Sequence, residues 1–334
     1  MTWSPEVGSY TLKIIAETGE RFADFAPYAA SINDDGVVAF QATLRGGGSG
    51  VYAGEGGPIT VIADSATDPF SEVSSHPDIT RDGLSCFYAD LGSESRGVFL
   101  VRNGEIVTVA DSAGPLGPTM NQAGTVAFRA DPRTGGSGVF TGSGGSVTTI
   151  AETGSRFSRF HGLPVIGGAE EVTFRADLKS GGGGIYVADD VRVASVVETG
   201  DVFSGLGLFP SANDAGTVAF CADLREGGSG VFTAATGRIT TVLDTSGPFE
   251  SFRGVLLNNE GRVVFYATPR GGTLGVFFGP DPVGDQLLSL GSPLFGSTVI
   301  DLALNPVSIN DAGQIAMRVG LEDERQLILR ADPW

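Results

Sequence analysis

A ten-residue pattern recurs along this chain and limits its fold more than any other feature. Residues 31–40 are "SINDDGVVAF", and residues 211–220 are "SANDAGTVAF". Aligned on the last residue of the pattern, seven copies are found, ending at Phe40, Phe87, Phe128, Phe174, Phe220, Phe265 and Met317. Successive copies lie 47, 41, 46, 46, 45 and 52 residues apart. This period is typical of the blades of a β-propeller.

Each repeat contains four predicted strands, named A to D here in chain order. The decamer provides the end of strand A, a turn and strand B; an apolar pair such as Val51-Tyr52 and a β-branched run such as "ITVIADS" form strands C and D. Strand B is apolar at consecutive positions, which indicates that both faces of its sheet are covered. Four-stranded sheets packed face to face around an axis form a propeller. The sequence therefore predicts an all-β, seven-bladed β-propeller with four-stranded blades.

The two ends of the chain predict how the ring closes. Residues 12–18, "LKIIAET", match strand D but precede the first strands A and B. The chain ends just after a seventh strand C. We therefore expect residues 12–18 to be the outer strand of the last blade, because this pairing covers two exposed sheet edges. An open solenoid would not need the offset, and residues 1–334 are expected to form a single domain.

Charge and composition exclude several classes of partner. The net charge is −18, from 39 acidic and 21 basic residues, which argues against nucleic acid and anionic membranes because both bind basic surfaces. No apolar run reaches the roughly 18 residues of a membrane span. Cys86 and Cys221 lie in non-adjacent repeats, so we expect two buried free thiols. We also expect a monomer.

The N-terminal segment bears on localisation. "MTWSPEVGSY" has neither the basic region nor the apolar region of a signal peptide. As it stands, the chain is therefore expected to be cytoplasmic. If a signal was removed, it is instead a secreted or surface protein.

The decamer and its spacing resemble the bacterial "NxxGxxAF" tandem-repeat family over essentially the whole chain. The full pattern occurs at 33–40, 121–128 and 213–220. Residues 310–317 end in Met317, and residues 258–265 have Val264 in place of alanine. Copies two and four depart further, with Thr80 and Gly167 in the asparagine position. The resemblance implies a propeller-like fold, often in secreted or surface-anchored proteins, and no specific reaction.

The "NDDG" element invites comparison with calcium-binding loops, which present several carboxylates around one ion. In other repeats Asn33-Asp34-Asp35-Gly36 becomes Asn121-Gln122-Ala123-Gly124 or Asn258-Asn259-Glu260-Gly261. Only the asparagine and the glycine persist, and these are the residues that a tight hairpin needs. We therefore predict a structural A–B turn whose acids are dispensable, with no metal site and no cofactor.

Two further recurring sets are interpreted as structural. Acid–hydroxyl pairs close strand D at Glu17-Thr18, Asp64-Ser65, Asp111-Ser112, Glu152-Thr153, Glu198-Thr199 and Asp244-Thr245. Basic residues recur five places after the strand-B aromatic, at Arg45, Arg133, Lys179, Arg225 and Arg270. Because both sets repeat from blade to blade, we expect them to be turn caps and ion pairs.

Function is better sought where the repeats differ. The segment leading into strand A varies, and it is expected to line the channel mouth on the face of the D–A and B–C loops. Proline recurs there at Pro77, Pro118, Pro164 and Pro210. The same entry segments of the seven repeats contain the candidate catalytic residues His76, His161, Tyr28 and Arg253, and the candidate ligand-binding residues Arg159, Phe209 and Asn305.

These residue types support three functional hypotheses. The first is a binding module for a small polar or carbohydrate-like ligand, with Tyr28 and Phe209 as stacking surfaces. The second is a polysaccharide lyase, in which a histidine or tyrosine removes a proton next to a carboxylate. The third is a protein-interaction scaffold with an acidic rim. The two histidines are also compatible with simple hydrogen bonding at loop ends.

Overall fold

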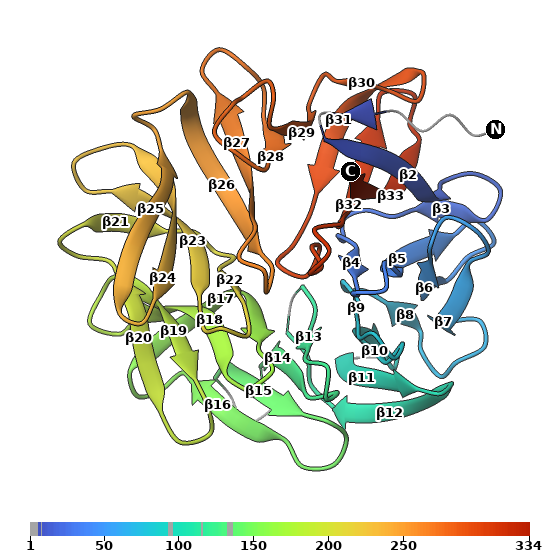
Figure 1. The fold of residues 1–334 in the computed structure, drawn as a ribbon. Coiled ribbons are helices and arrows are strands. Elements are labelled where there is room, and N and C mark those ends of the chain that lie inside the picture. Colours follow the sequence, from blue (N-terminus) through green and yellow to red (C-terminus); the bar gives the residue numbers. More distant parts are fainter. Residues whose placement is uncertain (1–5, 8, 93–95, 115, 132–135) are drawn as a thin grey trace.

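Seven β-sheets stand around a central axis in the computed structural model (Figure 1). The structure describes residues 6–7, 9–92, 96–114, 116–131 and 136–334, and these ranges contain no helix. Accordingly, no described helix is long and apolar enough to cross a membrane. The predicted all-β, seven-bladed propeller is confirmed.

The first four blades follow one another along the chain. Blade 1 contains β3 (Phe22–Asp24), β4 (Ser31–Ile32), β5 (Val38–Leu44), β6 (Ser49–Gly54) and β7 (Thr60–Asp64). Blade 2 contains β8 (Glu72–Val73), β9 (Asp78–Ile79), β10 (Ser85–Asp90), β11 (Arg96–Arg102) and β12 (Glu105–Ala110). Blade 3 contains β13 (Thr119–Met120), β14 (Val126–Ala130), β15 (Gly138–Gly142) and β16 (Thr148–Glu152). Blade 4 contains β17 (Phe157–Ile166), β18 (Val172–Leu178), β19 (Gly183–Ala188) and β20 (Val193–Glu198).

The last three blades complete the circle. Blade 5 contains β21 (Phe203–Leu206), β22 (Ser211–Ala212), β23 (Val218–Leu224), β24 (Ser229–Ala235) and β25 (Arg238–Asp244). Blade 6 contains β26 (Phe249–Leu257), β27 (Val263–Pro269), β28 (Gly275–Phe277) and β29 (Gln286–Ser289). Blade 7 has the order β1 (Glu6–Val7), β2 (Tyr10–Glu17), β33 (Gln326–Pro333), β32 (Ile315–Leu321), β31 (Ser297–Ala303) and β30 (Pro293–Leu294).

Not every blade has the expected four strands. In blades 1, 2 and 5 the innermost strand is split in two, as in β3 and β4, which both pair with β5. The gaps contain Pro27, Pro77 and Pro210, and proline interrupts a ladder because it has no N–H to donate. Blade 7 gains the short strands β1 and β30. These gaps in the inner strands, called bulges here, carry three of the variable residues of the repeat, namely Tyr28, His76 and Phe209.

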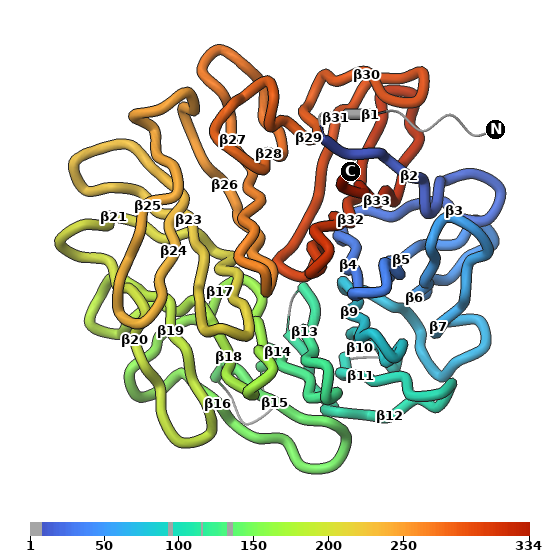
Figure 2. Tube along the Cα trace, viewed as in Figure 1, coloured from blue at the N-terminus to red at the C-terminus, as the bar shows by residue number. Residues whose placement is uncertain are grey.

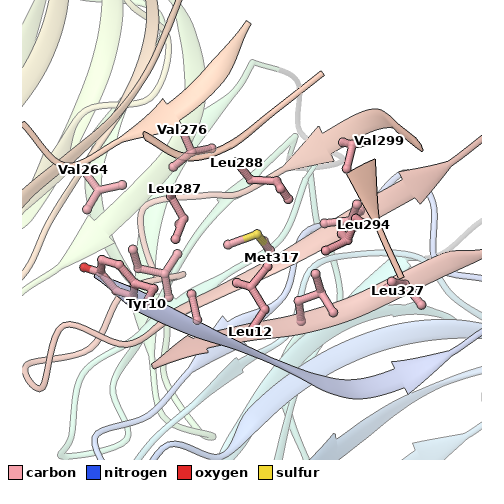
Figure 3. Packing of buried hydrophobic residues seen from close by; sticks show 14 of the residues in the cluster. Tyr10, Leu12, Val264, Val276, Leu287, Leu288, Leu294, Val299, Met317 and Leu327 are labelled. Carbon is pink, nitrogen blue, oxygen red and sulfur yellow. The ribbon is translucent and has the colours of Figure 1, made fainter. Parts of the chain in front are cut away.

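The N-terminal strand closes the ring. β2 pairs antiparallel with β33, with Leu12 opposite Ala331, so the first and last segments of the chain lie side by side (Figure 2). Tyr10 and Leu12 are buried against residues of blades 6 and 7, including Leu287 and Met317 (Figure 3). The predicted closure is confirmed, and it covers the sheet edges that an open ring would expose.

The asparagine of the decamer has two roles. Asn33 Oδ1 accepts hydrogen bonds from the backbone N–H groups of Asp35 (3.1 Å) and Val37 (2.9 Å), which caps the A–B turn. Its Nδ2 donates to the carbonyl oxygen of Thr80 in the next blade (2.9 Å). Equivalent interblade bonds run from Asn121 to Gly167, Asn213 to Asn258, Asn258 to Asn310, and Asn310 to Asn33. Asparagine persists because it links blades as well as capping turns.

The residue after this asparagine forms a second set of interblade links. Its backbone N–H donates to a side-chain oxygen of a neighbouring blade: Gly168 to Asp214, Asp214 to Asn259, Asn259 to Asp311, Asp311 to Asp34, and Arg81 to Gln122. Three acids of this turn, Asp34, Asp214 and Asp311, therefore have an interblade role that the sequence did not predict. Asp, Asn and Gln all offer an acceptor oxygen. The interblade hydrogen bond therefore recurs in these turns, although the type of residue that accepts it changes.

The other recurring sets cap turns as predicted, but the predicted ion pairs are not found for the described basic residues of the set, which bind carbonyl oxygens instead. Arg45, Lys179, Arg225 and Arg270 donate to carbonyl oxygens of D–A turn glycines, namely Gly19, Gly154, Gly200 and Gly247, while Arg133 lies outside the described residues. The hydroxyls of Ser65, Thr153, Thr199 and Thr245 accept backbone N–H groups of strand C or the segment just before it. Cys86 and Cys221 are buried and free, as expected. These structural contacts explain why the basic residues and the hydroxyls recur from blade to blade.

Candidate functional site

A cavity of about 420 Å³ lies between blades 6 and 7 and brings together three of the predicted site residues. Phe209 comes from the bulge of blade 5, Arg253 from β26, and Asn305 from the segment between β31 and β32. Leu274 and Leu290, at the B–C turn and the D–A connection of blade 6, also line it. The cavity therefore lies toward the face opposite the A–B turns.

Asn305 is held in one orientation. Its Oδ1 accepts a hydrogen bond from the backbone N–H of Val307 (3.0 Å), and its own backbone N–H donates to the hydroxyl oxygen of Ser308 (3.0 Å). The Ser308 hydroxyl is itself anchored to the carbonyl oxygen of Ala30 in blade 1 (2.5 Å). The amide nitrogen Nδ2 is buried and has no hydrogen-bonding partner among the described residues. Asn305 is 6% exposed, and its Nδ2 has almost no accessible surface, so this unpaired donor is enclosed within the protein.

Phe209 is positioned by the neighbouring blade. Gly162 in β17 adopts φ +60°, and a Cβ at this position would overlap the carbonyl oxygen of Leu208 and lie 3.3 Å from Phe209 Cδ1. Only glycine permits this approach of the two backbones. The Gly162 carbonyl oxygen also accepts a hydrogen bond from Arg129 in blade 3 (3.1 Å). The aromatic wall of the cavity is thus held through contacts that reach two blades away.

The remaining polar groups of the cavity come from residues that sequence reasoning missed. Tyr266 and Asp301 line it, and Asp301 Oδ2 forms an ion pair with the buried Arg318 (2.8 Å). Burial raises the pKa of Tyr266, so its phenol keeps its proton at neutral pH. Tyr266 could have been found from the sequence, because it occupies the position directly after the strand-B aromatic. This position is polar in six repeats, as Gln41, Tyr88, Arg129, Arg175, Tyr266 and Arg318, and is Cys221 in the seventh.

His76 and Tyr28 form a separate contact between blades 1 and 2. Their rings meet edge to face with centroids 5.7 Å apart. His76 is buried, and its Nδ1 accepts a hydrogen bond from the backbone N–H of Ala29 (3.2 Å). Burial lowers the pKa of His76 to about 4, so this imidazole is neutral at physiological pH. Neither residue lines the cavity between blades 6 and 7.

His161 lies in a third place, on β17 of blade 4. Its Nε2 is 2.7 Å from Asp177 Oδ2, and Asp177 Oδ1 is 3.1 Å from Arg175. Although burial raises the pKa of Asp177, the hydrogen bond from His161 and the charge of Arg175 outweigh it and lower that pKa overall. Arg159 is exposed on the same strand, opposite Asp177. The seven predicted residues are therefore divided among three locations.

A second cavity, of about 570 Å³, lies at the central channel beside the A–B turns of all seven blades. Its carboxylates, including Asp34, Asp214 and Asp311, already accept the interblade hydrogen bonds described above. In the described part of the chain no group of three or more His, Cys, Asp or Glu side chains could hold a metal ion. The carboxylates that line this cavity therefore serve to link neighbouring blades.

Comparison with known proteins bears on the fold and the family. No curated protein matches the chain. Among solved structures, the propeller domain of the Trilobed protease from Pyrococcus furiosus aligns with TM-score 0.56 and 11% identity, covering 79% of this chain and 84% of that one. Oligogalacturonate lyase from Vibrio parahaemolyticus aligns with TM-score 0.56 and 10% identity over 96% and 97% of the two chains.

An oligogalacturonate lyase in complex with manganese has TM-score 0.59 and 9% identity, covering 98% of this chain and 99% of that one. At these identities the likeness concerns the fold alone. The sequence comparison is more specific, because a family model matches residues 15–230, more than half of the chain and four of its blades. The repeat, the propeller and this match together show that the chain belongs to the family of unknown function DUF7453.

Proposed function

We propose that this propeller is a binding module that takes a small polar or carbohydrate-like ligand in the cavity between blades 6 and 7. The observation that carries the proposal is the convergence of Phe209, Arg253 and Asn305 from three different blades on one cavity. An aromatic face, a cation and a fixed amide around a partly apolar hollow are the usual elements of a small-molecule site. The variability of these positions among the repeats agrees with a single site rather than one per blade.

The groups in the cavity favour binding over proton abstraction. Tyr266 keeps its proton, because burial raises its pKa. Asp301 is engaged by Arg318 at 2.8 Å. His76 and His161, which the lyase hypothesis requires as bases, do not line this cavity. No catalytic step is therefore proposed, and the lyase and scaffold hypotheses stay predictions from the sequence, as does the relationship to the NxxGxxAF proteins.

A ligand screen by thermal shift tests the proposal, because a ligand that binds only the folded state raises the apparent stability. Hits are measured again with Phe209→Ala and Arg253→Gln, which change the wall and the cation of the cavity. Arg159→Gln is the matched control, since Arg159 is an exposed arginine in the corresponding strand of blade 4 and does not line the cavity. Hits that lose their effect in the first two variants and keep it in the control support the proposal. Hits that all three variants bind equally well would overturn it.

A further inference from the structure

The charges around the cavity between blades 6 and 7 do not balance. Asp301 is its one acidic lining residue in the described chain, and the guanidinium of Arg318 neutralises it at 2.8 Å. Arg253 also lines the cavity, and it forms no ion pair or hydrogen bond with any described residue. One unpaired positive charge therefore faces the cavity, in a chain whose net charge is −18. A local cation of this kind attracts an anionic group that the rest of the surface would repel.

The Asn305 amide, which also lines the cavity, is not open to a ligand. Its Oδ1 accepts the backbone N–H of Val307 at 3.0 Å, and its Nδ2 is enclosed within the protein without a partner among the described residues. Asp301 is paired with Arg318. Of the described lining residues, Arg253 is therefore the charged group that is left for a ligand, and a negatively charged group would complement it.

The rest of the wall is apolar. Phe209, Leu274, Leu290, Leu302 and Leu304 all line the cavity. This surface does not match a compact, fully hydrated anion, which would be desolvated there without compensation. It suits a ligand with a flat or apolar body and one charged group. The preferred bond of a guanidinium to such a group is the two-pronged contact with a carboxylate.

We propose that the ligand of this cavity is a carboxylic acid whose carboxylate binds Arg253, while its body lies against Phe209 and the leucines. This inference rests on the proposed function, because it names the ligand class of the same cavity. The body can be a sugar ring or an aromatic or aliphatic group. In each case the carboxylate is the group that the cavity recognises.

Matched pairs of acid and neutral compounds test the inference by calorimetric titration. Galacturonic acid is compared with galactose, and 3-phenylpropionate with 3-phenylpropionamide, so that the two pairs separate a sugar from an apolar body. Wild-type protein should bind at least one acid more tightly than its neutral partner by about tenfold or more, as expected for a charge-assisted hydrogen bond. Arg253→Gln should abolish that preference. Arg159→Gln should keep it, and Arg253→Lys should recover only part of it, because an ammonium cannot form the two-pronged contact.

The outcomes separate this inference from the proposed function. Equal binding of acid and neutral partner, or an acid preference that Arg253→Gln leaves unchanged, overturns the carboxylate inference. Absence of binding by both acids overturns it as well. In each of these cases the proposed function still stands if neutral ligands from the thermal-shift screen depend on Phe209. Arg253 has an exposed side chain without a described hydrogen bond or ion pair, so its variants are expected to fold, which their circular dichroism spectra check.

Discussion

Asp78 accepts a hydrogen bond from the backbone N–H of Met120 at 2.8 Å, and this bond joins blade 2 to blade 3. The same carboxylate accepts the N–H of Ile79 at 2.8 Å. Blade 2 lacks the usual linking asparagine, because Thr80 occupies that position. Asp78 thus supplies the interblade contact from two residues earlier. The cost is a buried carboxyl group, and burial raises its pKa to about 7.

Asp78→Asn should change how stability depends on pH. The folded pKa of about 7 lies above the unfolded value of about 3.9. The folded chain therefore holds an extra proton between these values, so the wild type loses stability as the pH rises from about 3.9 to about 7. The Asn variant cannot titrate, so its stability relative to wild type should rise with pH, by at most about 1.4 kcal/mol per pH unit. Urea unfolding across this window measures it, with the exposed Asp35→Asn as control.

His76→Gln should have the opposite effect on the pH profile. Burial lowers the folded pKa of His76 to about 4, below the unfolded value of about 6.5. As the pH falls from about 6.5 to about 4, the unfolded chain takes up a proton first, and the wild type loses stability. The glutamine variant should lose less over this range in the same unfolding measurements. An unchanged profile would contradict the burial of a neutral imidazole at this position.

Asn258→Ala should destabilise the ring by removing a turn cap and an interblade link together. Asn258 is buried; its Oδ1 accepts the N–H of Arg262 (2.7 Å) and its Nδ2 donates to Asn310 O (3.0 Å). Leaving these groups unpaired should lower the free energy of unfolding by about 1–3 kcal/mol. Glu260→Ala, exposed in the same turn, should change it by no more than about 0.5 kcal/mol. Similar losses for the two variants would count against the linking role.

Gly162→Ala should cost more than a positive φ alone. Gly162 combines φ +60° with a Cβ position that overlaps Leu208 O, whereas Gly237 has φ +78° and open space around it. Gly237→Ala therefore measures the backbone strain, of about 1–3 kcal/mol, and Gly162→Ala adds the displacement of the Leu208–Phe209 bulge. Chemical unfolding of both variants compares them. If the two lose equal stability, Gly162 does not position Phe209.

Leu12→Ala should weaken the closure of the ring. Leu12 is fully buried in the core cluster of blades 6 and 7. Truncating a buried leucine should lower the free energy of unfolding by about 2–5 kcal/mol. Lys13→Ala, at the next position of β2 and only partly buried, is the control and should have a much smaller effect. A small loss for Leu12→Ala would mean that the blade is stable without its N-terminal strand.

The architecture was predictable from the sequence because the residues that form its strands recur at regular spacings. The spacing of the strand-B residues set the number of blades, consecutive apolar positions required sheets covered on both faces, and the early strand D required closure by residues 12–18. The A–B turn was predictable only in part. Its asparagine and glycine were recognised, but the interblade bonds of Asp34, Asp214 and Asp311 were missed because their residue type varies between blades.

The sequence by itself determined the propeller, because local periodicity and the need to pair strand edges act through residues near one another in the repeat. It also marked the variable bulges as the place to search for a site. Only the tertiary structure decided which of those residues meet. Phe209, Arg253 and Asn305 converge on one cavity, whereas His76 binds Ala29 of the adjacent blade and His161 binds Asp177 of its own blade. Contacts between adjacent blades, such as Gly162 against Leu208, join residues some 46 positions apart and leave no local pattern in the chain.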